Sequence, residues 1–187
     1  MQKLLSVLII AFLCLYQPVF ANDVANTTKV FRDAGESGTF FKKSYGYAVF
    51  PTIGKAGIGI GGAYGKGQVY ALNKHTGESS MTQVSIGFQL GAQAYSQIVF
   101  FQDKRAFNEF TNGNFEFGAT AQAVAITAGV SANANTAGNS ATASGGKNNA
   151  VTAGDGYNKG MAVFTVAKGG LMYEASVSGQ KFSYTAK

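Results

Sequence analysis

The sequence predicts an α+β protein. Its core would be a mostly antiparallel, strongly bent β-sheet or a partly closed, barrel-like sandwich, with a few short helices. Two observations carry this prediction. Apolar and polar residues alternate with a period of two over several long stretches, as in strands that bury one face. Helical periodicity is confined to short segments, so the long crossover helices that parallel strands need are not expected and antiparallel pairing is favoured.

The N-terminal 21 residues have the features of a secretory signal peptide. Lys3 is followed by an apolar run over residues 4–16, and Val19-Phe20-Ala21 resembles a cleavage site. Cleavage after Ala21 would leave one domain over residues 22–187. The apolar run is shorter than the roughly 20 residues that a spanning helix requires. Retention of this segment as an anchor remains the alternative.

Composition argues against several classes of function. The one cysteine, Cys14, lies in the apolar run, so we expect neither a disulfide nor thiol chemistry in the mature chain. The single histidine, His75, and the nine carboxylates form no motif of metal ligands or catalytic groups. We therefore predict no metal, no cofactor and no enzymatic activity. Without Lys3, 14 basic and 9 acidic residues leave a net charge of +5, which favours phospholipid headgroups over nucleic acid outside the cytoplasm.

The segment from Asn22 to Ser44 predicts two short helices. Gly35 and Gly38 interrupt the pattern, and Ser37 is the expected cap of the second helical segment, residues 40–43. The apolar residues that recur at helical spacing in the first helix are Val24, Val30, Phe31 and Ala34.

The next stretch, FPTIGKAGIGIGGAYGKG (residues 50–67), is rich in glycine. Residues 57–62 fit the G-x-G-x-x-G pattern of dinucleotide-binding loops, but no helix signal follows them, which argues against a nucleotide site. Lys55 and Lys66 are expected in turns at its two ends. A period of two leaves one strand face bare, so we predict close packing against a helix or a second sheet. The two faces would be Gly57, Gly59 and Gly61 on one side and Ile58, Ile60 and Gly62 on the other.

Alternation is clearest over residues 81–101, and the length of this run predicts a bend or a bulge near Gly91. A short helix follows, with Asp103 as its N-cap and Gly113 as the residue that ends it. Alternation then returns from Phe115 onward.

Two further segments complete the chain. Residues 129–156 are almost all Ala, Asn, Gly, Ser and Thr, which predicts a mobile loop because such a stretch has little apolar surface to bury. The closing residues 161–185 predict a hairpin and a third strand, with turns at 168–170 and 178–179.

Three ordered blocks of sequence resemble the SYLF domain, a lipid-binding family known from eukaryotic actin-patch and phosphoinositide-binding proteins and from bacterial envelope proteins. The resemblance covers roughly residues 37–185. In the first block the matching residues are Phe50, Pro51, Lys55, Ala56, Gly57, Gly61, Gly62, Gly65, Lys66 and Gly67. The other two blocks are SIGFQLGAQAYSQIVFF and YNKGMAVFTVAKGGLMYEASVSG.

The resemblance implies a lipid-binding module of the cell envelope, periplasmic or secreted and peripherally associated with a membrane. Basic and aromatic side chains would meet anionic headgroups and the interface. A small integral outer-membrane β-barrel is one alternative, although the helix over 104–111 and the charged runs argue against it. An envelope adaptor that binds a protein partner is another. The candidate lipid-binding residues are Phe40, Phe41, Lys42, Lys43, Lys55 and Lys66.

Overall fold

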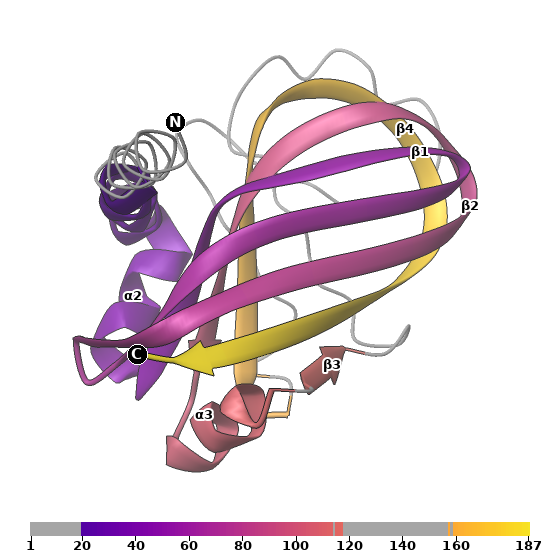
Figure 1. Ribbon diagram of the computed structural model, residues 1–187. Helices are drawn as coiled ribbons and strands as arrows, with labels where there is room; N and C mark the ends of the chain where they lie inside the picture. The colour runs from indigo at the N-terminus through magenta and orange to yellow at the C-terminus, as the bar shows by residue number, and fades with distance from the viewer. Residues whose placement is uncertain (1–19, 114, 118–156, 158) are drawn as a thin grey trace, which may run out of the picture.

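The computed structural model describes residues 20–113, 115–117, 157 and 159–187. Residues 1–19 of the predicted signal peptide and the predicted loop at 129–156 lie outside this part of the chain. One antiparallel sheet dominates the fold, with the strand order β1-β2-β4-β3 (Figure 1). Its strands are β1 (Gly46–Ala71), β2 (Lys74–Phe101), β3 (Phe115–Phe117) and β4 (Met161–Ala186). The helices cover residues 20–33, α2 (Gly35–Lys43) and α3 (Lys104–Thr111). The predicted α+β class is confirmed.

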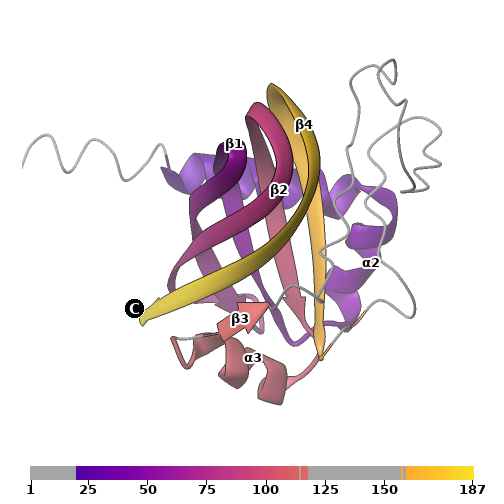
Figure 2. The ribbon, with the colours of Figure 1, turned by 90° about the vertical axis from the view of Figure 1, so that its right-hand side faces the viewer.

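The three long strands each turn back on themselves. β1, β2 and β4 have 26, 28 and 26 residues, so a straight strand of this kind would extend about 85 Å at ~3.3 Å per residue. Figures 1 and 2 show instead that the strands curve over together, so that each contributes a limb to both of two facing layers. We call this bend the tip: residues 57–61 of β1, 86–91 of β2 and 172–177 of β4. The opposite end, with the β1–β2 hairpin and α3, is the base.

Glycines with positive φ mark the bend. Gly59 has φ 71° and Gly91 has φ 128°, and the β1–β2 register shifts between Ile58 and Ile60. Glycine adopts such angles at little cost because it has no Cβ, and a bulge sharpens the local twist. The predicted bend near Gly91 is therefore confirmed.

Below the tip, the two limbs of β1 pack tightly against each other. A Cβ on Gly67 would lie 2.5 Å from the Val49 carbonyl oxygen, and one on Gly65 would lie 2.5 Å from Ile53 Cγ1. The close approach predicted for the glycine stretch thus occurs, but it is between limbs of the same strand. At Gly59 the prediction is wrong, because a Cβ there would meet nothing within 4 Å.

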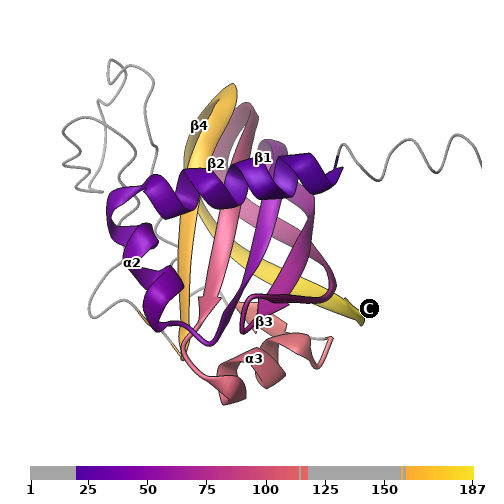
Figure 3. The ribbon, with the colours of Figure 1, turned by 90° about the vertical axis from the view of Figure 1, so that its left-hand side faces the viewer.

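Two apolar clusters hold the base together. The inner cluster fills the space between the layers, and the outer cluster lies between the sheet and the first two helices; Figure 3 shows the helix of residues 20–33 crossing the outer face of the strands. The largest inner side chains are Phe50, Phe101, Phe110, Phe182 and Met81; the outer ones are Phe31, Phe40, Phe100 and Phe164.

Of the two predicted helix caps, Asp103 is confirmed and Ser37 is wrong. Asp103 caps α3 as predicted, since its side chain accepts a hydrogen bond from the Ala106 amide at 2.8 Å, and Gly113 has φ 87°. Ser37, in contrast, does not cap α2. It lies inside the helix, fully buried, and donates to the Phe31 carbonyl at 2.6 Å, so it joins the end of one helix to the start of the next.

The predicted C-terminal hairpin is wrong. β4 is one continuous strand that pairs with β2 from Met161 opposite Phe101 to Ala186 opposite Gly77. The glycines taken as turn residues lie inside this ladder, at 169–170 and 179. Glycine favours turns, but it also permits a strand to curve without breaking its pairing. Here the glycines of β4 lie in a strand that bends and stays paired.

Candidate functional site

Exposed apolar side chains gather at and beside the tip. Ile58 is 81% exposed, Ile60 68% and Ile86 66%. Strand register brings them together, because Ile58 pairs with Leu90 and Ile60 pairs with Ile86. We call the full set the apolar tip patch: Ile58, Ile60, Tyr64, Val84, Ile86 and Leu90.

The patch accounts for most of the large exposed apolar residues in the described part of the chain. The two outside it are Val30, on the helix of residues 20–33, and Leu72, in the β1–β2 hairpin at the base. Isolated residues of that kind are ordinary on protein surfaces, whereas a contiguous group marks a surface that meets another apolar phase or a partner. The tip is therefore the first candidate for a binding surface.

Lysines border the patch. Lys66 follows Tyr64 by two residues and so lies on the same face of β1. Lys181 pairs with Thr82, which in turn pairs with Tyr64, so this lysine shares that face too. Lys168, on the other layer, donates to Thr52 Oγ1 at 2.9 Å. All three lysines are exposed, and Lys66 and Lys181 place positive charge beside the patch on its base side.

Between the layers, the interior becomes polar toward the tip. Gln97 donates to Gln180 at 3.2 Å, and Gln180 donates to Gln83 at 3.0 Å, which links both layers through buried amides. Tyr95 donates to the same Gln83 oxygen at 3.3 Å. An amide both donates and accepts, so it can extend such a chain. No described buried side-chain nitrogen or oxygen lacks a partner, so the polar interior is satisfied.

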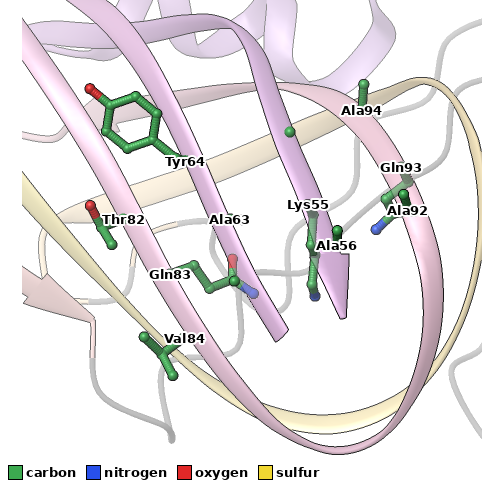
Figure 4. A pocket seen from close by; sticks show the side chains of 12 residues that line it. Lys55, Ala56, Ala63, Tyr64, Thr82, Gln83, Val84, Ala92, Gln93 and Ala94 are labelled. Atoms are coloured by element: carbon green, nitrogen blue, oxygen red, sulfur yellow. The ribbon is translucent and has the colours of Figure 1, made fainter. Parts of the chain in front are cut away.

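A pocket of about 770 Å³ opens beside the tip between the two limbs of β1. Its wall includes Lys55, which is only 7% exposed, and the amides Gln83 and Gln93 from the two limbs of β2. Figure 4 shows Lys55 and Gln83 on opposite sides of the space between the limbs. The remaining described lining residues are mostly small: Gly54, Ala56, Gly62, Ala63, Tyr64, Thr82, Val84, Ala92 and Ala94.

Glycines on the two faces of β1 have different surroundings. Gly65 and Gly67 are buried and lie directly against the opposite limb. Gly54 and Gly62 are exposed on the outer face, where a Cβ would meet nothing within 4 Å at Gly54 and only the Gln83 oxygen at 3.8 Å at Gly62.

The predicted surface of α2 lies on the side of the sheet opposite the tip (Figure 1). Phe40 is 1% exposed and packs against Phe100 and Phe164, so the prediction that its ring could enter a membrane is wrong. Phe41 is half-buried against Phe100. Lys42 and Lys43 are exposed at the C-terminal end of α2; the Lys43 amine lies 3.9 Å from the Phe40 ring centroid.

The other two candidate lysines lie nearer the tip, inside β1 rather than in turns. Lys66 is exposed and Lys55 is buried, so the predicted single surface of six residues is divided between two sides of the molecule. Two residues of the first block that resembles the SYLF domain contribute to the fold itself. Phe50 belongs to the inner cluster, and the Pro51 carbonyl accepts a hydrogen bond from Ser96 at 2.7 Å.

Sequence reasoning missed the apolar tip patch although it found the strand. The predicted alternation over residues 81–101 is present, but its exposed side is inverted near the tip. Val84 and Ile86 are exposed, whereas Gln83 and Ser85 are buried. Periodicity identifies two faces of a strand and cannot by itself say which one faces the interior.

The described part of the chain shows neither a metal site nor a membrane-spanning helix. No group of three or more His, Cys, Asp or Glu side chains there could hold a metal ion. None of its helices combines the length and apolar character needed to cross a bilayer.

Comparisons with known proteins agree with the sequence resemblance. The profile of the Ysc84 family, described as "Las17-binding protein actin regulator", matches residues 82–186, more than half of the chain. Beta cell expansion factor A from Aeromonas veronii is 28% identical over 166 residues, which cover 86% of this chain and 54% of that protein. The chain thus spans about half the length of this curated relative. No solved structure matches it significantly. The chain belongs to the SYLF family, to which the matching Ysc84 profile corresponds.

Proposed function

We propose that this protein is a non-enzymatic lipid-binding module of the cell envelope, periplasmic or secreted, that attaches to anionic phospholipid surfaces through its tip. The observation that carries the proposal is the apolar tip patch, six exposed apolar side chains at and beside the end of the folded sheet that no helix of the described chain covers. The resemblance to the SYLF domain, which implies a lipid-binding module, supports it.

The energetics favour insertion of the tip. Burying an isoleucine side chain away from water contributes about 2 kcal/mol. The exposed fractions of Ile58, Ile60 and Ile86 are 81%, 68% and 66%, so most of that contribution is available to a membrane. Together they offer several kcal/mol, enough to compete with the loss of translational freedom on binding.

The bordering lysines supply the preference for anionic lipid. Each basic residue near an anionic membrane contributes about 1 kcal/mol. Lys66 and Lys181 lie on the base side of the patch, where headgroups would be if the tip entered the acyl region. The net charge of +5 that remains without Lys3 acts in the same direction.

The test is co-sedimentation with vesicles of phosphatidylglycerol and phosphatidylcholine, compared with phosphatidylcholine alone. We expect pelleting with the anionic vesicles. The double variant Ile58→Ser with Ile86→Ser should lower the partition coefficient by about 100-fold, from ~1.5 kcal/mol per side chain. Leu72→Ser, an exposed apolar residue at the base, is the matched control and should pellet like the wild type. Negligible pelleting of the wild type with both vesicle types would refute the proposal.

A protein partner is the second candidate, favoured by one observation: the description of the matching family names binding to a protein. In that case the apolar tip patch would be covered by a folded partner. The vesicle assay separates the two functions, because a surface evolved for a protein would show no dependence on anionic lipid.

A further inference from the structure

We infer that the pocket between the limbs of β1 takes the phosphate-bearing headgroup of one anionic lipid, with Lys55 as the group that binds its charge. This inference rests on the proposed attachment of the tip to a membrane. It adds a specific site for a single lipid molecule to that general attachment.

The polarity of the two strand faces decides which part of the lipid enters. Near the tip, the outer face carries Ile58, Val84 and Ile86, all exposed. The inner face at the same level carries Lys55 and Gln83, both buried. Acyl chains are compatible with the outer face and headgroups with the inner one, because a charged or polar group is costly to place in an apolar phase. A lipid at the mouth would therefore insert its headgroup and leave its chains outside.

Most of the pocket wall is apolar, and its few polar side chains suit an anion. Lys55 supplies a cation, and the side-chain amides of Gln83 and Gln93 can donate N–H groups. An ammonium carries three N–H donors, so an interaction within the protein leaves it able to donate to a ligand as well. The described lining residues include no carboxylate. Lysine is a common partner for phosphate oxygens in proteins, where it acts as a compact point charge.

The opening has the size and position that such a ligand needs. Its volume of about 770 Å³ lies within the range of small-molecule sites in proteins. It adjoins the apolar tip patch, since Tyr64 and Val84 belong to both. The opening lies beside the tip and not at its end, so a headgroup can enter from the side while the tip stays in the membrane.

The experiment is a calorimetric titration of the full protein with monomeric dihexanoyl phosphatidylglycerol. Dihexanoyl phosphatidylcholine and inorganic phosphate serve as comparison ligands. We expect one binding site for the phosphatidylglycerol, weaker binding of the zwitterionic lipid, and at least about tenfold loss of affinity in Lys55→Met, as for a charged hydrogen bond. Lys74→Met, at an exposed position in the β1–β2 hairpin at the base, should bind within about twofold of the wild type. Inorganic phosphate that binds as tightly as the lipid would overturn the headgroup assignment.

A second measurement follows binding to the wild-type protein, so its result does not depend on whether Lys55→Met folds. Lysines are labelled by reductive methylation with ¹³C-formaldehyde and assigned from single Lys→Arg variants. The Lys55 signal should shift on addition of the short-chain lipid more than the signal of Lys74, which is exposed at the base. If no lysine signal in the pocket responds while the wild type still pellets with anionic vesicles, the pocket inference fails and the proposed attachment stands. If the Lys55 signal shifts but no pelleting occurs, the pocket binds lipid and the proposed membrane attachment fails.

Discussion

At the scale of single residues, glycine has two distinct roles in β1. Gly59 permits the backbone conformation of the bend, and its surroundings are open. Gly65 and Gly67 permit close contact between limbs. The sequence predicts that this stretch is a strand and that a bare face would meet another element. It could not predict which glycines do so, because the partner is the same strand after a bend, and alternation carries no information on where a strand folds over.

Replacing Gly67 by alanine tests the contact role. The new Cβ would lie 2.5 Å from the Val49 oxygen and 2.6 Å from Phe50 Cδ1, so the limbs must move apart. We expect Gly67→Ala to lower the free energy of unfolding in urea by about 2 kcal/mol. Gly54→Ala is the matched control, because its Cβ meets nothing within 4 Å, and should stay within about 0.5 kcal/mol of the wild type. Equal losses in both variants would contradict the assigned contacts.

The buried tyrosines predict a loss of stability at alkaline pH. Burial raises the pKa of Tyr47 above 10.0; the nearby Tyr70 adds to this rise and Arg32 opposes it. The fold thus favours the neutral phenol. Its contribution is complete below the unfolded-state pKa of about 10 and is lost as pH rises through the folded-state pKa. We expect the free energy of unfolding to fall as pH rises above about 10, and to fall less in Tyr47→Phe. An identical decline in the two proteins would show that Tyr47 is not responsible.

At the scale of elements, local signals predict the ends of α3 and fail for α2 and β4. Asp103 and Gly113 act through contacts within a few residues, so the sequence alone reveals them. Ser37 looked like a cap, but it is buried at the junction between two helices, where tertiary contacts decide its partner. The glycines of β4 looked like turns, but β2 pairs with them throughout.

The capping of α3 is testable by substitution. Asp103→Ala removes the acceptor for the Ala106 amide and should lower the free energy of unfolding by about 1 kcal/mol. Asp103→Asn keeps a side-chain oxygen in place and should recover most of that loss. The measurement is urea denaturation followed by far-ultraviolet circular dichroism. A loss in Asp103→Asn as large as in Asp103→Ala would mean that charge, including the 3.9 Å pair with Arg105, matters more than the cap.

At the scale of the whole molecule, polarity is distributed differently at the two ends. At the base, the interior is apolar and helices cover much of the outer face. Near the tip, the interior holds glutamines and a lysine, and the outer face exposes isoleucines. The fold class and the strand-rich pattern were predictable from periodicity. The candidate site was only partly predictable: Lys55 and Lys66 lie near it, but Ile86 and Leu90 would have been assigned to the buried face. Which face of a bent sheet becomes buried depends on contacts between limbs that are far apart in the sequence.

The most direct test of attachment through the tip uses the absence of tryptophan from the sequence. Ile58→Trp places a single fluorescent reporter at the most exposed residue of the patch, and Val30→Trp places one on the helix of residues 20–33, across the sheet from the tip. With phosphatidylglycerol vesicles, we predict a blue shift of the Ile58→Trp emission and quenching by brominated acyl chains, with neither effect for Val30→Trp. Vesicle-bound protein whose Ile58→Trp emission stays unshifted and unquenched would contradict insertion of the tip.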